Sequence, residues 1–162
     1  MRKSVVMVTG ANGEIGQRLI EHLTADGGQD VIALDLHPLA PALASRCLAT
    51  FVGDILDDDL LQRVVSEYAI HTIFHLAALL STRAEYTPFA AHRVNVGGTL
   101  KLLDLAADQA RRDGHPVKFI FPSSIAVYGL PNLATKQATG RVHEGQFNTP
   151  TTMYGCNKLY CE

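Results

Sequence analysis

Two side chains near the end of the sequence form a pair that could move a proton. Tyr154 and Lys158 lie four residues apart in YGCNK, so on a helix they share one face. Tyrosine is a poor base because its unperturbed pKa is about 10, but a nearby ammonium stabilises the phenolate and lowers that pKa. Such a tyrosine could exchange a proton with a substrate hydroxyl near neutral pH. The motif alone leaves open a surface Tyr–Lys pair without function.

A second candidate group is the hydroxyl pair Ser123 and Ser124, at the end of an apolar stretch, residues 115–124, that predicts a strand. Parallel strands end at the ligand crevice of an open sheet, so a hydroxyl there could hold a substrate oxygen in line with Tyr154. The alternative is an ordinary polar start of a loop.

Three glycines, Gly10, Gly13 and Gly16, occupy the stretch TGANGEIG. They follow an apolar run at residues 4–8 that predicts a buried strand, and they precede an amphipathic pattern typical of a helix. Glycine lets a backbone approach a phosphate closely, and a helix N-terminus supplies N–H groups and a positive dipole end. This stretch alone suits a pyrophosphate site and a simple tight strand-to-helix turn equally, so the choice depends on residues further along the chain.

Acidic residues close the next two predicted strands. Asp35 ends the strand at residues 30–36, at the distance from the glycines where an acid accepts hydrogen bonds from an adenine ribose. It would repel the extra phosphate of NADP, and the next three residues include no arginine, so we expect NAD. Asp54 follows the strand at 48–54 and could bind the adenine amino group or cap the helix that begins near Asp57.

The elements that must position these residues alternate between strand and helix. Beyond those named, we expect a short helical or irregular piece at residues 38–46, a helix at 57–69, a fourth strand at 71–78 and a long helix at 88–112. A long irregular segment follows at 128–151, and a last helix begins near residue 151. This alternation predicts an α/β fold, a Rossmann-type doubly wound parallel sheet. We expect residues 1–162 to form one NAD-binding domain and, because only five strands are present, to be the N-terminal part of a longer chain.

Composition narrows the function classes. Of the 162 residues, 47% are apolar and 19% charged, which suits a globular protein. The net charge is −2 and no basic run exceeds two residues, so we expect neither nucleic acid nor a membrane as a partner. The three cysteines form no disulfide or metal pattern, which favours the cytoplasm. His71 and His75 lie on a predicted strand about 13 Å apart, too far to bind one metal ion.

The order of TGANGEIG, Asp35, GDI, HLAA, PSSIAVYG and YGCNK resembles the extended short-chain dehydrogenase/reductase family, which contains the nucleotide-sugar epimerases and dehydratases. The resemblance implies a Rossmann domain that binds NAD. The cofactor-binding residues it implies are Gly10, Asn12, Gly13, Glu14, Ile15, Gly16, Asp35, Asp54, Ile55, Leu76, Ala77, Ala78, Tyr154 and Lys158, and His75 matches the same segment as Leu76 to Ala78.

The resemblance also implies a catalytic set of Ser124, Tyr154 and Lys158, with Asn95 supporting the lysine through water. The implied chemistry is hydride transfer between a substrate carbon and C4 of nicotinamide. Tyr154 would take the hydroxyl proton, Ser124 would bind the same substrate oxygen, and Lys158 would hold the nicotinamide ribose and tune the tyrosine. A homodimer is also expected from the family, through helices that include the Asn95 and Tyr154 segments.

Within the family, the pattern SSIAVYG and YGCNK is similar to nucleotide-sugar 4-epimerases, so a nucleotide sugar is the first expected substrate. The stretch LLSTRAEYTPFAAHRVN is also similar to short-chain-type L-threonine 3-dehydrogenases and sugar-acid dehydrogenases. In that branch Ser81 and Thr82 would lie near a substrate carboxylate; otherwise they form a simple turn. The expected substrate-binding residues are therefore Ser81, Thr82, Ser124 and Tyr154.

Two further alternatives remain. The segment at residues 130–148 is longer than in either branch and carries Lys136, Arg141 and His143, which would contact an anionic substrate or lie in solvent. If the protein ends at residue 162, the alternative function is that of a non-catalytic NAD-binding module.

Overall fold

The computed structural model of the chain describes residues 2–162, and these form two compact units. The first unit comprises the chain up to Ala78 together with Gly98–Pro122. The second comprises Leu79–Gly97 and Ser123–Glu162.

The first unit is built on a five-stranded parallel sheet with the order β3-β2-β1-β4-β5. Its strands are β1 (Lys3–Thr9), β2 (Val31–Asp35), β3 (Ala49–Val52), β4 (Tyr68–His75) and β5 (Lys118–Ile120). The chain runs outward from β1 to β3 and then returns to place β4 on the other side of β1. The strand order therefore reverses between β1 and β4, which is where an open α/β sheet binds its ligand. The predicted Rossmann-type sheet is confirmed.

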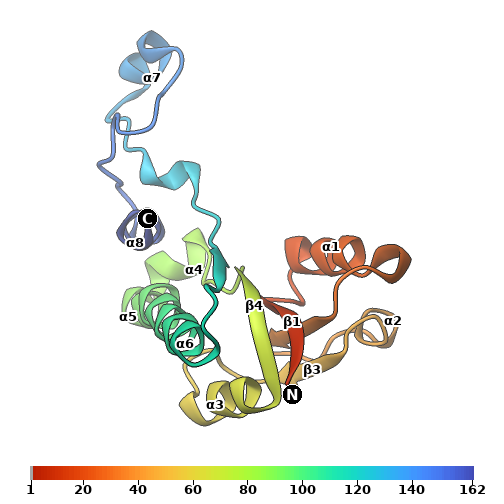
Figure 1. Cartoon of the computed structure of the whole chain (residues 1–162). Coiled ribbons are helices and arrows are strands. Elements are labelled where there is room, and N and C mark those ends of the chain that lie inside the picture. The colour runs from red at the N-terminus through yellow and green to blue at the C-terminus, as the bar shows by residue number, and fades with distance from the viewer. Residues whose placement is uncertain (1) are drawn as a thin grey trace. The chain divides into compact units, whose positions relative to one another are not determined.

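Helices cover both faces of this sheet (Figure 1). The helices α1 (Glu14–Leu23) and α2 (Pro41–Ala44) lie on one face, and α3 (Asp58–Glu67) and α6 (Gly98–Asp113) on the other. Side chains alternate along a strand, so Val6 and Val8 of β1 pack in the core beneath α1 and α2, whereas the buried Val5 and Met7 point to the opposite face. Burial on both faces explains why the strands read as continuous apolar runs.

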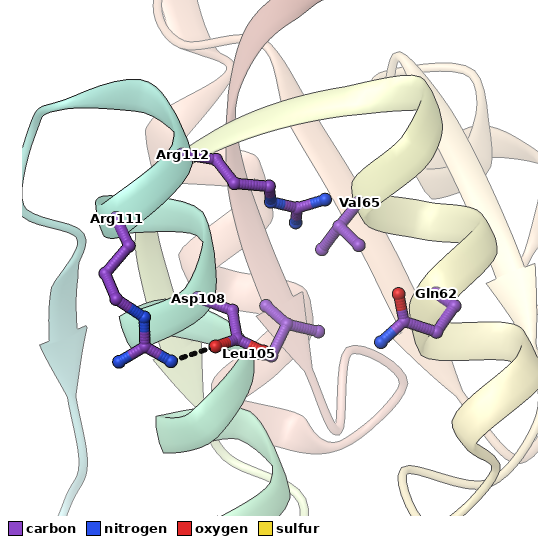
Figure 2. Close-up of a pocket in the computed structure, with 6 residues that line it drawn as sticks. All are labelled: Gln62, Val65, Leu105, Asp108, Arg111 and Arg112. Carbon is purple, nitrogen blue, oxygen red and sulfur yellow. Dashed lines mark hydrogen bonds and ion pairs between the residues drawn. The ribbon is translucent and has the colours of Figure 1, made fainter.

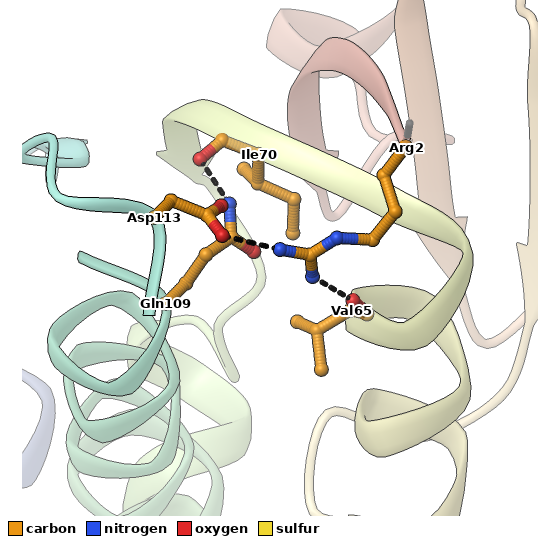
Figure 3. Close-up of polar contacts among 5 residues, drawn as sticks. All are labelled: Arg2, Val65, Ile70, Gln109 and Asp113. Atoms are coloured by element: carbon orange, nitrogen blue, oxygen red, sulfur yellow. Dashed lines mark hydrogen bonds and ion pairs between the residues drawn. The ribbon is translucent and has the colours of Figure 1, made fainter. Parts of the chain in front are cut away.

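A polar cluster ties the ends of several elements together at the edge of the first unit that carries the start of β4 (Figure 3). The Arg2 guanidinium donates to the carbonyl of Val65, in α3, and pairs with Asp113, in α6. The buried amide of Gln109 donates to the carbonyl of Ile70 in β4. These bonds hold the C-terminal ends of α3 and α6 on the sheet.

The second unit contains helices only. They are α4 (Ser81–Tyr86), α5 (Pro88–His92), the π-helix η2 (Arg93–Gly97), the 3₁₀ turn η3 (Ile125–Val127), α7 (Leu133–Thr139) and α8 (Met153–Cys161). Among residues 2–162 no helix is both long and apolar enough to cross a membrane.

Four expectations about the elements need correction. The single helix expected at 88–112 is interrupted by η2, whose last residue, Gly97, forms a helix-weakening pair with Gly98 at the start of α6. The fourth strand starts at Tyr68, because this residue is extended and pairs with Lys3. The fifth strand is limited to Lys118–Ile120. The segment at 128–151 is not wholly irregular, since Asn132 caps α7 by accepting from the Thr135 N–H at 2.8 Å.

Candidate functional site

The glycine turn joins β1 to α1 at the point where the strand order reverses. Gly10 has a φ of +66°, which disfavours any residue with a Cβ, and a Cβ there would come within 2.6 Å of the backbone nitrogen of Ala77. At Gly16 a Cβ would lie 2.4 Å from the carbonyl oxygen of Gly10. These two glycines let α1 begin directly against the ends of β1 and β4.

The N-terminus of α1 has the chemistry of an anion site. Gly13 is the N-cap residue and contributes no side chain to bond the first N–H groups of the helix. The side chains of Glu14 and Ile15 are exposed there, and 68% of Ile15 is accessible. Backbone N–H groups and the helix dipole at such a terminus suit a phosphate.

Asp35 ends β2 as expected, and its carboxylate is bound by backbone groups rather than left in solvent. One oxygen, Oδ2, accepts from the N–H of Asn12 at 2.9 Å, and Oδ1 accepts from the N–H of His37 at 3.0 Å. The acid therefore lies beside the glycine turn, and each oxygen keeps a further lone pair for a ligand hydroxyl.

The residues after β3 divide into a turn and a core contact. Asp54 does not cap α3; it accepts from the Leu56 N–H at 3.0 Å, and Asp57 is the N-cap, accepting from the Leu60 N–H. Ile55 is 4% exposed and packs so closely on Gly98 of α6 that a Cβ there would lie 2.3 Å from its Cδ1. Cofactor contact by Asp54 and Ile55 stays a prediction.

The end of β4 is organised by His75, which the sequence placed in the expected cofactor segment without indicating its partners. His75 is 1% exposed, and its Nδ1 lies 2.8 Å from the hydroxyl of Thr9 while its Nε2 lies 3.0 Å from that of Thr99. The Thr9 hydroxyl also accepts from the N–H of Ala77 at 3.4 Å. Leu76 packs against the core beneath α1 and α2, and Ala77 follows beside Gly10. Thr9 and Thr99 thus fix the segment expected to line the cofactor.

Metal binding finds no support in the part of the chain that the structure describes. No group of three or more His, Cys, Asp or Glu residues among residues 2–162 could hold an ion. The three cysteines are free thiols.

In the second unit the structure brings Ser124, Tyr154 and Lys158 together. The Ser124 hydroxyl is hydrogen-bonded to Tyr154 and also accepts from the Ala126 N–H at 3.2 Å. The Lys158 ammonium lies 5.7 Å from the centre of the Tyr154 ring. Lys158 is only 5% exposed, which excludes the alternative of a solvent-exposed Tyr–Lys pair.

Burial dominates the electrostatics of this cluster. It raises the pKa of Tyr154 above its usual value, and the hydrogen bond from Ser124 offsets part of that rise. Burial lowers the pKa of Lys158, and the electrostatic interaction with the sulfur of Cys161 in its charged form offsets part of that fall. The lowered tyrosine pKa expected from the sequence is therefore not found in the chain on its own.

An N-cap defines the start of the tyrosine helix, and one close contact sets its position against η3. Thr152 caps α8 by accepting from the Gly155 N–H at 3.0 Å. A Cβ at Gly155 would lie 2.2 Å from the carbonyl oxygen of Ala126, so glycine lets α8 approach η3 and bring Tyr154 to Ser124. The sequence carried a signal for both residues, because a capping threonine and a glycine flank the tyrosine in TMYG.

Asn95 lies in η2, and a π-helical turn is frequent at functional sites. Its side-chain amide bonds both backbone groups of Leu79, with Oδ1 accepting at 2.8 Å and Nδ2 donating at 3.0 Å. Its backbone carbonyl accepts from the Cys161 thiol at 3.5 Å, one helical turn beyond Lys158. Support of the lysine through water stays a prediction; the two bonds to Leu79 give Asn95 a role in anchoring the segment before α4.

Ser81 and Thr82 are exposed at the start of α4, so the simple turn considered for them is wrong. The long segment at 130–148 leaves and returns at one point, where the Gly129 N–H donates to the Phe147 carbonyl at 2.8 Å. Its helix α7 buries no residue.

A separate cleft of about 270 Å³ lies between α3 and α6 in the first unit (Figure 2). Gln62 and Val65 line it from α3, and Leu105, Asp108, Arg111 and Arg112 from α6. Arg111 is ion-paired with Asp108. None of the expected site residues lines this cleft.

The chain belongs to the NAD dependent epimerase/dehydratase family, whose pattern matches residues 6–162. An uncharacterized epimerase/dehydratase of Staphylococcus saprophyticus is 32% identical over 157 residues, which cover 95% of this chain and 45% of that protein. The chain thus spans about half the length of the curated relatives it matches.

Solved structures of related enzymes have the same fold as this chain. An L-threonine dehydrogenase from Cupriavidus necator in its holo form superposes with a TM-score of 0.79 at 30% identity, covering 97% of this chain and 48% of that one. A UDP-glucose 4-epimerase of Thermotoga maritima, solved with UDP-glucose, gives 0.78 at 25% identity, covering 96% and 48%. The expected family is confirmed.

Proposed function

We propose that residues 1–162 form the NAD-binding domain of an enzyme that transfers a hydride at a substrate carbinol. The observation that carries the proposal is the position of Tyr154 in the second unit, where the ammonium of the buried Lys158 lies 5.7 Å from the centre of its ring and Gly155 lets α8 pack against the turn that follows Ser124. A phenol, a hydroxyl and an ammonium clustered in this way suit proton exchange with a substrate hydroxyl.

The residues around the glycine turn fit NAD. The uncapped N-terminus of α1 suits the pyrophosphate, and the carboxylate of Asp35 suits the adenine ribose. Bound NAD would supply the hydride acceptor or donor. We assign Asp35 the role of excluding the additional phosphate of NADP.

The chain's own residues handle the proton. Tyr154 would take the proton of the substrate hydroxyl during oxidation and return it during reduction. Ser124 would donate to the same substrate oxygen, and Lys158 would favour the phenolate by its charge. Because burial raises the pKa of Tyr154 in the chain alone, a further positive charge, such as that of an oxidised nicotinamide, would favour the active form.

A nucleotide sugar is the first proposed substrate, since the chain belongs to an epimerase/dehydratase family and resembles a UDP-glucose 4-epimerase. L-threonine or a related hydroxy acid is the second. It is favoured by the 30% identity to an L-threonine dehydrogenase and by the exposed hydroxyls of Ser81 and Thr82 in α4. Basic residues at 136–143 are proposed to assist an anionic substrate.

A panel of nucleotide sugars, L-threonine and sugar acids, each offered with NAD⁺, tests the proposal. Net formation of NADH identifies a dehydrogenase, and an altered sugar without net NADH identifies an epimerase. Tight NAD binding with no conversion of any substrate would contradict the catalytic proposal and leave an NAD-binding module.

A homodimer in the cytoplasm is proposed as the working form. Family resemblance supports the dimer, and the three free thiols suit a reducing compartment. Sedimentation equilibrium of the purified protein tests the dimer, and a monomer at micromolar concentration would contradict it.

A further inference from the structure

The first turn of α8 carries the tyrosine of the proposed site, and its backbone N–H groups need partners. A helix leaves its first four N–H groups without partners inside the helix. Thr152 satisfies that of Gly155 through its hydroxyl. The N–H of Met153, the residue before Tyr154, donates to the carboxylate of Glu85 at 2.6 Å.

Glu85 belongs to α4, a different segment of the second unit, 68 residues earlier in the chain. A carboxylate that accepts from a backbone N–H at a helix start makes a charge-assisted bond, which is stronger than a neutral one. Its negative charge also interacts favourably with the positive end of the helix dipole. Glu85 is therefore suited to holding the start of α8 in place.

The element that presents Glu85 is itself anchored on both sides. Before α4, the Asn95 amide holds both backbone groups of Leu79. After it, the Thr87 hydroxyl and N–H both donate to the carbonyl of Arg83, at 2.8 and 3.0 Å. Within α4, Ala84 is fully buried. The Glu85 carboxylate thus bonds Met153 from a helix whose two ends are anchored.

We propose that Glu85 is a positioning residue that fixes the first turn of α8 and thereby holds the Tyr154 hydroxyl against Ser124. Glu85 acts through the backbone of Met153 and does not itself touch the reacting atoms. Because α4 also carries Ser81 and Thr82, the same bond links the proposed substrate-binding segment to α8, the helix that carries Tyr154. This inference rests on the proposed function only for its effect on turnover.

Amide hydrogen exchange tests the positional part without any substrate. In the Glu85→Ala variant, the amide of Met153 should exchange at least about tenfold faster than in the parent protein, because a bond to a charged acceptor is lost. Glu85→Gln keeps an acceptor oxygen at the same reach and should restore most of the protection. Glu67→Ala removes an exposed carboxylate of α3 and serves as the matched control.

Turnover tests the functional part. With a substrate identified, Glu85→Ala should lower kcat about tenfold or more while the Kd for NAD stays within about twofold, since the glycine turn is untouched. Unchanged exchange at Met153 in Glu85→Ala, or equal loss in the Ala and Gln variants, would overturn the inference. If no substrate is turned over by the parent protein, the proposed function fails, and the exchange result still decides the role of Glu85.

Discussion

The carboxylate of Asp35 holds the glycine turn: its Oδ2 accepts the backbone N–H of Asn12 at 2.9 Å, between Gly10 and Gly13. The second oxygen accepts from His37. The residue proposed to select NAD is thus also part of the scaffold of the proposed pyrophosphate site. Cofactor choice and stability of the turn are consequently coupled through one side chain.

This coupling predicts a double effect of Asp35→Ala. The variant should lose the preference for NAD⁺ over NADP⁺, because no carboxylate repels the additional phosphate. It should also lose about 2 kcal/mol of unfolding free energy, because two N–H groups lose a charged acceptor. Cofactor titrations and urea denaturation measure the two effects. Tighter binding of NADP⁺ than NAD⁺ by the parent protein would contradict the role given to Asp35.

Gly10 and Gly114 offer a matched pair of alanine substitutions. Both have positive φ, +66° and +74°, so an alanine at either position costs about 1–2 kcal/mol of conformational energy. Only at Gly10 would the Cβ also collide with the backbone of Ala77; at Gly114 nothing lies within 4 Å. Gly10→Ala should therefore be more destabilising by about 1–3 kcal/mol and should abolish NAD binding, whereas Gly114→Ala should bind NAD normally.

Equal unfolding free energies for the two variants would show that the close approach of the glycine turn to β4 is not required. Calorimetry on the parent protein and both variants provides the comparison.

The polar cluster of Figure 3 predicts a stability effect remote from the proposed site. Gln109→Ala leaves the carbonyl of Ile70 without its donor in a buried place and should cost about 2 kcal/mol. Arg2→Ala should cost about 1 kcal/mol, since the side chains of Arg2 and Asp113 are about a quarter exposed. Urea denaturation measures both, and a larger loss for Arg2→Ala would contradict the ranking.

The sheet and the glycine turn could be predicted from the sequence because their signals are local. Apolar runs, glycines and a strand-ending Asp35 each lie within a few residues of the structure they specify. The bond from Glu85 to Met153 spans 68 residues, and no local pattern in α4 points to the N–H group it meets. The interruption of the long helix at η2 also escaped prediction, because apolar periodicity continues through a single π-helical turn.

The electrostatics of the tyrosine could be predicted only in part. The spacing of Tyr154 and Lys158 placed both on one helix, as found. The sequence does not show how deeply each is buried, and burial decides the direction of the tyrosine pKa shift. Likewise, Asp54 was equally suited to two roles, and only the geometry shows that Asp57 caps α3.

The pH dependence of oxidation follows from the hydrogen bond between Ser124 and Tyr154. Oxidation needs the phenolate, so the rate should rise as the pH passes upward through the tyrosine pKa. The bond from Ser124 lowers that pKa, so Ser124→Ala should move this rise to higher pH as well as lowering kcat. The neighbouring Ser123 bonds Glu162 instead, and Ser123→Ala should leave the profile in place. An unmoved profile in Ser124→Ala would contradict this assignment.

The most direct test compares the parent protein with Tyr154→Phe, each saturated with NAD⁺ and given the substrate found in the panel. Phenylalanine keeps the ring but cannot carry the proton, so kcat should fall by about 10²–10⁴-fold while the Kd for NAD⁺ changes little. Turnover is followed by the formation of NADH or of the altered sugar. Undiminished turnover in Tyr154→Phe would contradict the proposal that this tyrosine is the acid–base group.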